Sequence, residues 1–130
     1  DIYENGQAGQ ETDYKKAMKF HEKACEGKVG AACARVAGYY DEGRGTEQNL
    51  AKASKFYETA CTYEDASGCH AIADMYERGD GVKKDETKAM DFYGLACDYG
   101  SRGACADFRK LYKIMLYNFK QPYFMEGRTK

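Results

Sequence analysis

Six cysteines lie along the chain in two series, and both series advance by 36 residues. The two series are Cys25, Cys61 and Cys97, and Cys33, Cys69 and Cys105. Three further columns keep the same step: Ala17, Ala53 and Ala89; Phe20, Phe56 and Phe92; and Tyr40, Tyr76 and Tyr112. A fixed period of this length is the signature of a solenoid, in which similar units stack on one another. The repeat therefore predicts a single domain over 1–130, made of stacked copies of one small unit.

Within each unit the apolar residues have helical spacing. Ala17, Phe20 and Ala24 follow an i, i+3, i+7 pattern, which lines one face of a helix. A second apolar run ends at Gly43 or Gly79, and glycine readily adopts the left-handed conformation that ends many helices. The first helix of each unit, helix A, is predicted over 13–27, 49–62 and 85–98, and the second, helix B, over 31–42, 67–78 and 103–117. No segment alternates as a strand does, so we predict an all-α fold, an α/α solenoid of three helix pairs.

The boundaries of the units follow from the same alignment. The predicted units are 13–48, 49–84 and 85–120, and the expected N-caps of their first helices are Asp13, Asn49 and Asp85. Residues 1–12 are expected to end a helix B of a preceding unit, because 3–6 is similar in sequence to 40–43. After Tyr112 no glycine comes where the repeat would place one, so the last helix is expected to run on and cap the stack. Residues 121–130 would then form an aromatic and basic tail.

The two cysteines of each pair have seven residues between them, for example Cys25 and Cys33. On one straight helix their Cα atoms would lie about 12 Å apart, whereas a disulfide needs roughly 4.4–6.8 Å. A bridge therefore requires that the chain reverses between helix A and helix B, and glycines between the cysteines permit this. Zinc binding or free thiols are the alternatives, but zinc sites usually use closer cysteine pairs, often with histidines. Disulfides would place the protein in an oxidising compartment.

Composition excludes several classes of function. The chain has 20 Lys and Arg against 21 Asp and Glu, which gives no general argument for binding nucleic acid or an anionic membrane. From Arg109 onward, however, six basic residues stand against one acid, Glu126, so a basic end follows an acidic body. No apolar run approaches the roughly 20 residues that span a bilayer, so membrane insertion is not expected. A start at Asp1 without a signal peptide indicates a mature product or an excised piece.

Signatures of catalysis are missing from the sequence. The three serines, Ser54, Ser67 and Ser101, do not open a Ser-x-x-Lys motif or lie in a Gly-x-Ser-x-Gly motif. The two histidines, His21 and His70, stand alone, and no His-Glu-x-x-His metal motif is present. We therefore expect no catalytic residue, no metal and no cofactor, and no enzyme mechanism follows from the residues themselves.

A binding surface is the more favourable interpretation. His21, Tyr57 and Tyr93 share one position on helix A in successive units, and aromatic side chains with polar ends are common in protein interfaces. Neighbouring positions on the same helices add charged groups: Lys19, Glu22, Lys55, Glu58 and Asp91. Together they form the predicted binding face on the concave side of the stack. Packing of the three rings in the core between units is the alternative, and for each ring alone it is favoured.

The unit Ala-x2-Phe-[His/Tyr]-x2-Ala-Cys-x7-Cys, followed by Tyr-x2-Gly-x-Gly, resembles the Sel1-like repeat. Its paired cysteines are similar to the cysteine-rich branch of that family, the Helicobacter cysteine-rich proteins. The resemblance covers about 3–116, and the stretches 23–33 and 76–85 carry it. It implies disulfide-linked helix pairs in a right-handed superhelix with a concave face, and a secreted or periplasmic location. A mitochondrial assembly factor shares the pattern, so the intermembrane space is the alternative location.

The functions of this family are mixed, so the resemblance implies several candidates. Family members include protein adaptors, proteins that bind β-lactams and hydrolyse them weakly, and proteins that neutralise bacterial toxins. We expect a scaffold that binds another protein through the helix A face. The alternatives are a protein that binds a β-lactam or cell-wall muropeptide with weak β-lactamase activity, and a toxin-neutralising immunity protein. Fold alone does not choose among these candidates.

Overall fold

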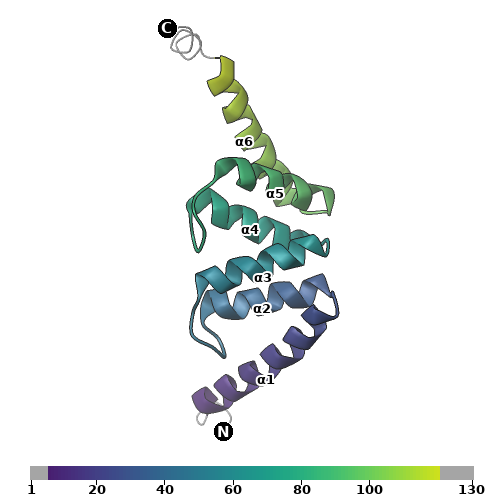
Figure 1. Ribbon diagram of the computed structural model, residues 1–130, viewed down its shortest axis with the longest axis vertical. Coiled ribbons are helices and arrows are strands. Elements are labelled where there is room, and N and C mark those ends of the chain that lie inside the picture. Colours follow the sequence, from purple (N-terminus) through teal and green to yellow (C-terminus); the bar gives the residue numbers. More distant parts are fainter. Residues whose placement is uncertain (1–5, 121–130) are drawn as a thin grey trace.

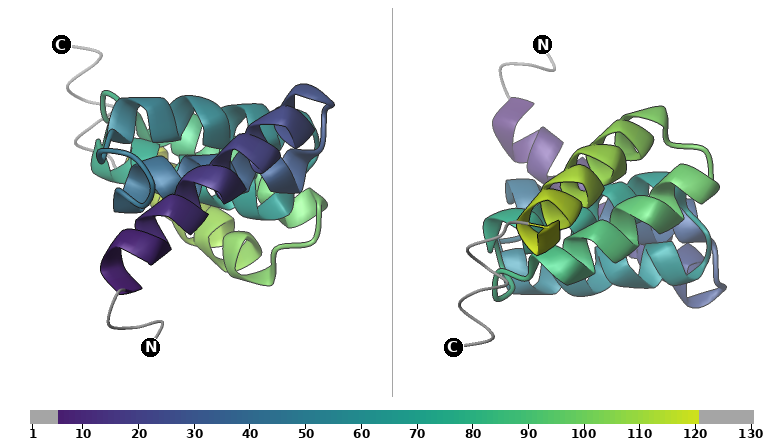
Figure 2. Two further views of the ribbon diagram at one scale, coloured as in Figure 1. Left: turned by 90° about the horizontal axis from the view of Figure 1, so that it is seen from below. Right: turned by 90° about the horizontal axis from the view of Figure 1, so that it is seen from above.

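The computed structural model describes residues 6–120, and it describes side-chain surroundings from residue 13 onward. The described chain forms six α-helices and no strand, which confirms the prediction of an all-α fold. The helices are α1 (Gly6–Glu26), α2 (Gly30–Glu42), α3 (Leu50–Thr62), α4 (Ala66–Arg78), α5 (Glu86–Asp98) and α6 (Arg102–Lys120). They follow one another along the long axis of the molecule, with α1 at one end and α6 at the other (Figure 1). Seen along that axis, the helices superpose as a stack (Figure 2).

The first helix differs from its prediction. α1 begins at Gly6 and continues through Asp13 without a break, so the prediction that Asp13 caps a helix start was wrong. The stretch 10–16 contains neither proline nor glycine, and nothing in it interrupts the backbone hydrogen bonds of a helix. Residues 6–12 therefore belong to the same helix as the first predicted unit, and 1–5 lie outside the described residues.

Elsewhere the helix ends confirm the sequence pattern. Asn49 accepts a hydrogen bond from the backbone N–H of Lys52, and Asp85 accepts one from Lys88, each at 3.0 Å. Gly43 and Gly79 end their helices in the left-handed region, with φ of 74° and 80°. α6 has no such stop and continues to Lys120, three residues beyond its predicted end at 117.

Small residues allow the helices to approach closely. The alanines that α3 and α5 turn toward their neighbouring helices are completely buried: Ala53 and Ala60 in α3, and Ala89 and Ala96 in α5. At Gly68 an added Cβ would lie only 2.5 Å from the Cβ of Ala60, so α3 and α4 touch at a point where no side chain fits. Each helix packs mainly against the helices before and after it, and α2 also contacts α4. The core is therefore a row of small interfaces along the stack.

All six cysteines are paired in disulfides, which confirms the predicted bridges and rules out free thiols or cysteine-bound zinc. The pairs are Cys25–Cys33, Cys61–Cys69 and Cys97–Cys105, with Cα–Cα distances of 4.6, 4.5 and 4.7 Å. The chain reverses between the members of each pair at Lys28, Glu64 or Gly100, all of which have positive φ. Each bridge thus joins the end of one helix to the start of the next within a unit.

The loops after α2 and α4 fold back onto an earlier helix. Gly45 lies against the backbone of Tyr14, and Gly81 lies against Leu50 at the start of α3. An added Cβ would come within 3.0 Å of the Tyr14 carbonyl carbon at Gly45, and within 2.4 Å of the Leu50 oxygen at Gly81. The second glycine of each Gly-x-Gly pair therefore closes the loop onto the stack. No helix in the described part of the chain is both long and apolar enough to cross a membrane.

Candidate binding surfaces

The tyrosines of the predicted binding face point toward carboxylates of the preceding helix B. Tyr57 on α3 donates a hydrogen bond to Asp41 on α2, with 3.5 Å between the two oxygens. One unit later, the Tyr93 hydroxyl lies between Asp74 and Glu77 of α4, 2.6 Å from Oε1 of Glu77. Tyr93 is only 1% exposed, so its ring belongs to the core between units and is not available to a partner. The structure thus supports the packing alternative for Tyr93.

Burial and negative charge both favour the protonated form of these tyrosines. Burial, together with the nearby charges of Asp41 and Glu42, raises the pKa of Tyr57 to about 12. The pKa of Tyr93 is also raised, first by burial and then by its hydrogen bonds to Asp74 and Glu77. The two hydroxyls therefore remain donors and tie each helix A to the helix B before it.

We predict that this protonation makes the fold sensitive to alkaline pH. The folded pKa of Tyr57, about 12, lies above the ordinary value of 10, so unfolding becomes easier as pH rises from 10 toward 12. The Tyr57→Phe variant should lose about 1 kcal/mol less stability over this range, after allowance for partial exposure. Urea unfolding at pH 9 and pH 11 measures the difference, and equal losses in both proteins would contradict it.

The other predicted residues divide between two surroundings. His21 is half-buried, with Nδ1 2.8 Å from the backbone oxygen of Ala17 and its ring edge-on to Phe20. Lys19, Lys55, Glu58 and Asp91 are exposed, and Glu22 is partly exposed. Glu58 and Asp91 both line a shallow pocket of about 310 Å³ between α3 and α5. Two members of the predicted face, Glu58 and Asp91, therefore share one hollow.

Stacked aromatic rings form the contact between successive units. Tyr40 of α2 stacks on Phe56 of α3 with ring centres 5.8 Å apart, and Lys52 lies over the tyrosine. The same arrangement recurs one period later with Tyr76, Phe92 and Lys88. α2 and α4 thus each offer a tyrosine that the following helix covers.

The third tyrosine of this column is not covered in the same way. Among residues 13–120, Tyr112 stacks only on Phe108 of its own helix, and it is 43% exposed. Four further apolar side chains of α6 are exposed with it: Ile114, Met115, Tyr117 and Phe119. Tyr112, Met115 and Phe119 follow an i, i+3, i+7 spacing and so share one side of the helix, and we call these three residues the bare α6 face.

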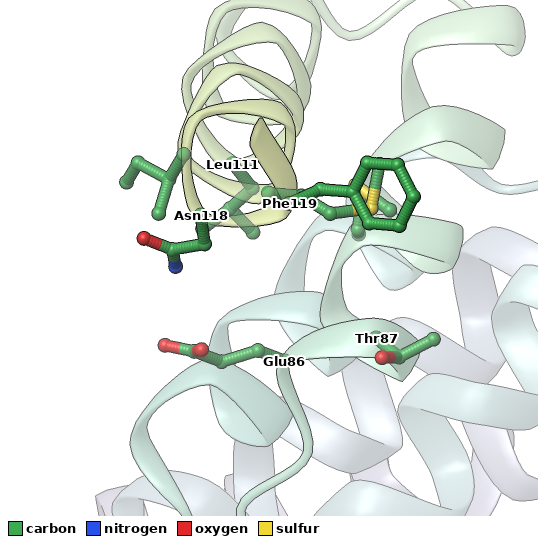
Figure 3. A pocket seen from close by; sticks show the side chains of 8 residues that line it. Glu86, Thr87, Leu111, Asn118 and Phe119 are labelled. Carbon is green, nitrogen blue, oxygen red and sulfur yellow. The ribbon is translucent and has the colours of Figure 1, made fainter. Parts of the chain in front are cut away.

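A groove lies beside the bare α6 face, where the last turns of α6 pass over the start of α5. Figure 3 shows Leu111 and Phe119 of α6 on one side and Glu86 and Thr87 of α5 on the other. Its volume is about 310 Å³, and Met90, Ile114 and Met115 complete its apolar lining. Glu86 holds the position that Leu50 holds one unit earlier, where Gly81 closes its loop. The groove therefore occupies the place of the Gly-x-Gly loop that α6 lacks.

The charge on α6 also departs from that of the other B helices. α6 carries five basic residues and one acid, Asp107. Lys110 and Lys113 stand where α4 has Asp74 and Glu77, the two carboxylates that receive the Tyr93 hydroxyl. A helix that packs on α6 in the register of the repeat would therefore face ammonium groups, and carboxylates on that helix would complement them.

A polar cluster joins α4 to α6. Nε2 of His70 lies 3.1 Å from Oδ2 of Asp107, and Nδ1 of His70 lies 3.4 Å from the hydroxyl of Ser101. Asp74 lies one turn after His70 on α4, and among the described residues these two and Asp107 form the group able to hold a metal ion. The Ser101 hydroxyl also accepts the backbone N–H of Ala104, so this serine caps α6.

Comparison with known protein families identifies the repeat. The model of the Sel1 repeat matches residues 1–29, 30–62 and 66–101, which is more than half of the chain. This chain belongs to the Sel1-repeat family. The family model places the boundaries between units elsewhere than we predicted. Its second match, 30–62, covers α2 and α3, whereas the predicted units pair α1 with α2 and α3 with α4. A periodic sequence can be divided at any phase, so the unit boundaries predicted above stay a prediction.

Solved structures of Sel1-repeat proteins are similar to this chain. Cysteine-rich protein B of Helicobacter pylori is 32% identical, with a TM-score of 0.67, and the match covers 68% of this chain and 67% of that one. A Sel1 repeat protein from Oxalobacter formigenes is 26% identical, with a TM-score of 0.70, over 72% of this chain and 39% of that one. The match to the Helicobacter pylori protein confirms the prediction of an α/α solenoid and the resemblance to the Helicobacter cysteine-rich proteins.

A third structure has the same fold in a larger protein. The protective antigen c5321 of uropathogenic Escherichia coli is 29% identical, with a TM-score of 0.72, over 85% of this chain and 24% of that one. This chain thus spans two thirds of the first protein and less than half of the other two. A comparison with curated protein sequences gave no match.

Several residues of these surfaces were missed by the sequence analysis. His70 was treated as lone, because Asp107 lies 37 residues away and reaches it only when α6 packs on α4. The exchange of Asp74 and Glu77 for Lys110 and Lys113 is visible in the alignment of the Sel1 repeats. This reversal of charge is the sequence signal that distinguishes the last helix B from the one before it.

Proposed function

We propose that this Sel1-repeat protein is an extracytoplasmic scaffold that binds another protein through the bare α6 face and the groove beside it. The supporting observation is the repeated contact of the stack. Tyr40 and Tyr76 are each covered by a phenylalanine of the following helix, whereas Tyr112 is 43% exposed. The matching occupant is an amphipathic helix with an aromatic residue and carboxylates, because Lys110 and Lys113 flank the contact.

The location rests on the disulfides. Three intramolecular bridges persist only in an oxidising compartment, and the Helicobacter relative belongs to a cysteine-rich group. A secreted or periplasmic location is the proposal, and the mitochondrial intermembrane space stays the alternative.

The helix A face predicted from the sequence is a second candidate contact. Its support is the pocket that Glu58 and Asp91 line together with Tyr76 and Phe92. Hydrolysis of β-lactams and neutralisation of a toxin remain predictions from the resemblance. Ser101 lies beside His70, with 3.4 Å between its hydroxyl oxygen and Nδ1, and the same oxygen accepts the backbone N–H of Ala104.

A peptide with the sequence of α5 provides a direct test of the bare α6 face. Residues 85–98 are acidic and carry Phe92, and they already pack on a helix B in this protein. A labelled peptide with Cys97→Ser should bind the folded chain saturably, and Phe119→Asp should weaken binding at least about tenfold, because burying a phenylalanine contributes about 1.5–3 kcal/mol. Fluorescence anisotropy measures the affinity, which should fall with added salt.

The matched control is Phe20→Asp at the opposite end of the stack. Phe20 is 69% exposed and Phe119 is 58% exposed, so the two exchanges are chemically alike but lie far apart. Phe20→Asp should leave the affinity unchanged. Equal losses in both variants, or no saturable binding to the unaltered chain, would overturn the proposed surface.

A further inference from the structure

The cluster around His70 combines the donor atoms that bind a transition metal. One imidazole nitrogen of His70 and one carboxylate oxygen each from Asp74 and Asp107 all lie within 4.8 Å of one another. His70 and Asp74 are four residues apart on α4, so both side chains leave the same face of that helix. Asp107 approaches from α6 and already contacts Nε2 of His70 at 3.1 Å.

The three residues break the repeat, which argues against a purely structural role. One unit earlier, the positions of His70, Asp74 and Asp107 hold Ala34, Gly38 and Ala71. The stack therefore forms in that unit without any of these polar groups. One unit later the first two positions hold Ala106 and Lys110, so His70 and Asp74 have no counterpart in any unit.

Neighbouring residues already fix two of the three donors. The Tyr93 hydroxyl donates toward Oδ1 of Asp74 and toward Glu77, and this contact helps to hold the Asp74 side chain in place. The Ser101 hydroxyl lies 3.4 Å from Nδ1 of His70 and is itself held by the backbone of Ala104. An outer partner of this kind orients a metal-binding imidazole and selects which nitrogen is free.

We propose that His70, Asp74 and Asp107 bind one Zn²⁺ ion that links α4 to α6. Zinc accepts imidazole nitrogen and carboxylate oxygen, and with three protein ligands it keeps a fourth position for water. Nε2 of His70 gives up its contact with Asp107 to the metal, and Nδ1–H then donates to Ser101. The Arg78 guanidinium, 3.7 Å from Oδ2 of Asp74, is on a side chain that is 67% exposed and can turn into solvent. Glu77 adds a further negative charge nearby.

The site is independent of the proposed protein-binding surface. Its ligands come from one side of α4 and from the first turns of α6, whereas the groove is lined by residues from Leu111 onward and by α5. Failure of zinc binding therefore leaves the peptide experiment unaffected, and the reverse also holds.

Titration of the oxidised, chelator-treated chain with zinc sulfate tests the site. Isothermal calorimetry should show one bound equivalent, and His70→Ala and Asp107→Asn should each weaken binding at least about tenfold. Zinc should also raise the thermal midpoint of the unaltered chain, since it binds the folded state. Magnesium, which prefers oxygen ligands, should give no comparable binding.

The second histidine provides the matched control. His21 lies outside the cluster, so His21→Ala should bind zinc with the affinity of the unaltered chain. Circular dichroism confirms that each variant is folded, and folding is expected because Ala34 occupies the His70 position in a unit that folds. The proposal is overturned if the unaltered chain takes up no zinc at millimolar concentration. It is also overturned if the His70→Ala variant binds zinc as tightly as the unaltered chain does.

Discussion

Reduction of the three disulfides is expected to remove half or more of the free energy that keeps this chain folded. Each bridge closes a loop with a sequence separation of eight residues, which stabilises the fold by about 2.5 kcal/mol in the chain-entropy model. Together the bridges contribute about 7.5 kcal/mol, and a domain of this kind has only about 5–15 kcal/mol in total. Circular dichroism during urea titration, with and without a phosphine reductant, measures the loss.

Removal of single bridges separates the effect of the cross-link from that of packing. The Cys61→Ala/Cys69→Ala variant should lose more stability than the Cys97→Ala/Cys105→Ala variant. The loop lengths are equal, but Cys61 and Cys69 are buried at 3% and 0% exposure, whereas the other pair is half-buried. If the free energies of unfolding of the fully reduced and the oxidised chain differ by less than about 0.5 kcal/mol, the bridges do not support the fold as we propose.

Gly81→Ala is expected to be the most damaging of the loop substitutions, at about 3 kcal/mol. Part of the cost is conformational, because φ at this position is 74°, a region that alanine adopts only with strain of about 1 kcal/mol. The larger part is steric, since the new Cβ would lie 2.4 Å from the Leu50 oxygen and 2.7 Å from its carbonyl carbon. The loop would have to lift from the start of α3.

Gly79→Ala separates these two contributions. Its φ of 80° imposes the same strain, but the nearest atom to the added Cβ is the Lys84 side chain at 3.2 Å. We expect a loss of about 1 kcal/mol for Gly79→Ala. Urea unfolding of both variants gives the difference. Equal losses would show that the close approach to Leu50 has no energetic effect.

The architecture was accessible from the sequence because its signals repeat. Every apolar column, N-cap and glycine stop appears two or three times. The predicted architecture therefore does not depend on any single position, where tertiary packing could override the local signal. Single signals were less reliable. Asp13 matched Asn49 and Asp85 by position, yet α1 passes through it, because no proline or glycine in 10–16 ends the preceding turns.

The surfaces were less predictable, because they depend on what each residue meets across helices. Tyr57 and Tyr93 occupy equal positions in the sequence, but Tyr93 is the more deeply buried, between two carboxylates of α4. The meeting of His70 with Asp107 depends on the packing of α6, which periodicity alone does not specify. The bare α6 face follows from the absence of a following helix A in the described chain.

The order of the cysteines along the chain has a consequence for how the protein is made. Six thiols can pair in 15 ways, but every native bridge joins the two that are nearest in sequence. Joining Cys33 to Cys61 instead would close a loop more than three times as long, at an extra entropic cost of about 1 kcal/mol. Correct oxidation is thus favoured as soon as each hairpin emerges during synthesis or export. Maturation of this protein should therefore depend on a supply of oxidant more than on an isomerase that reshuffles wrong pairs.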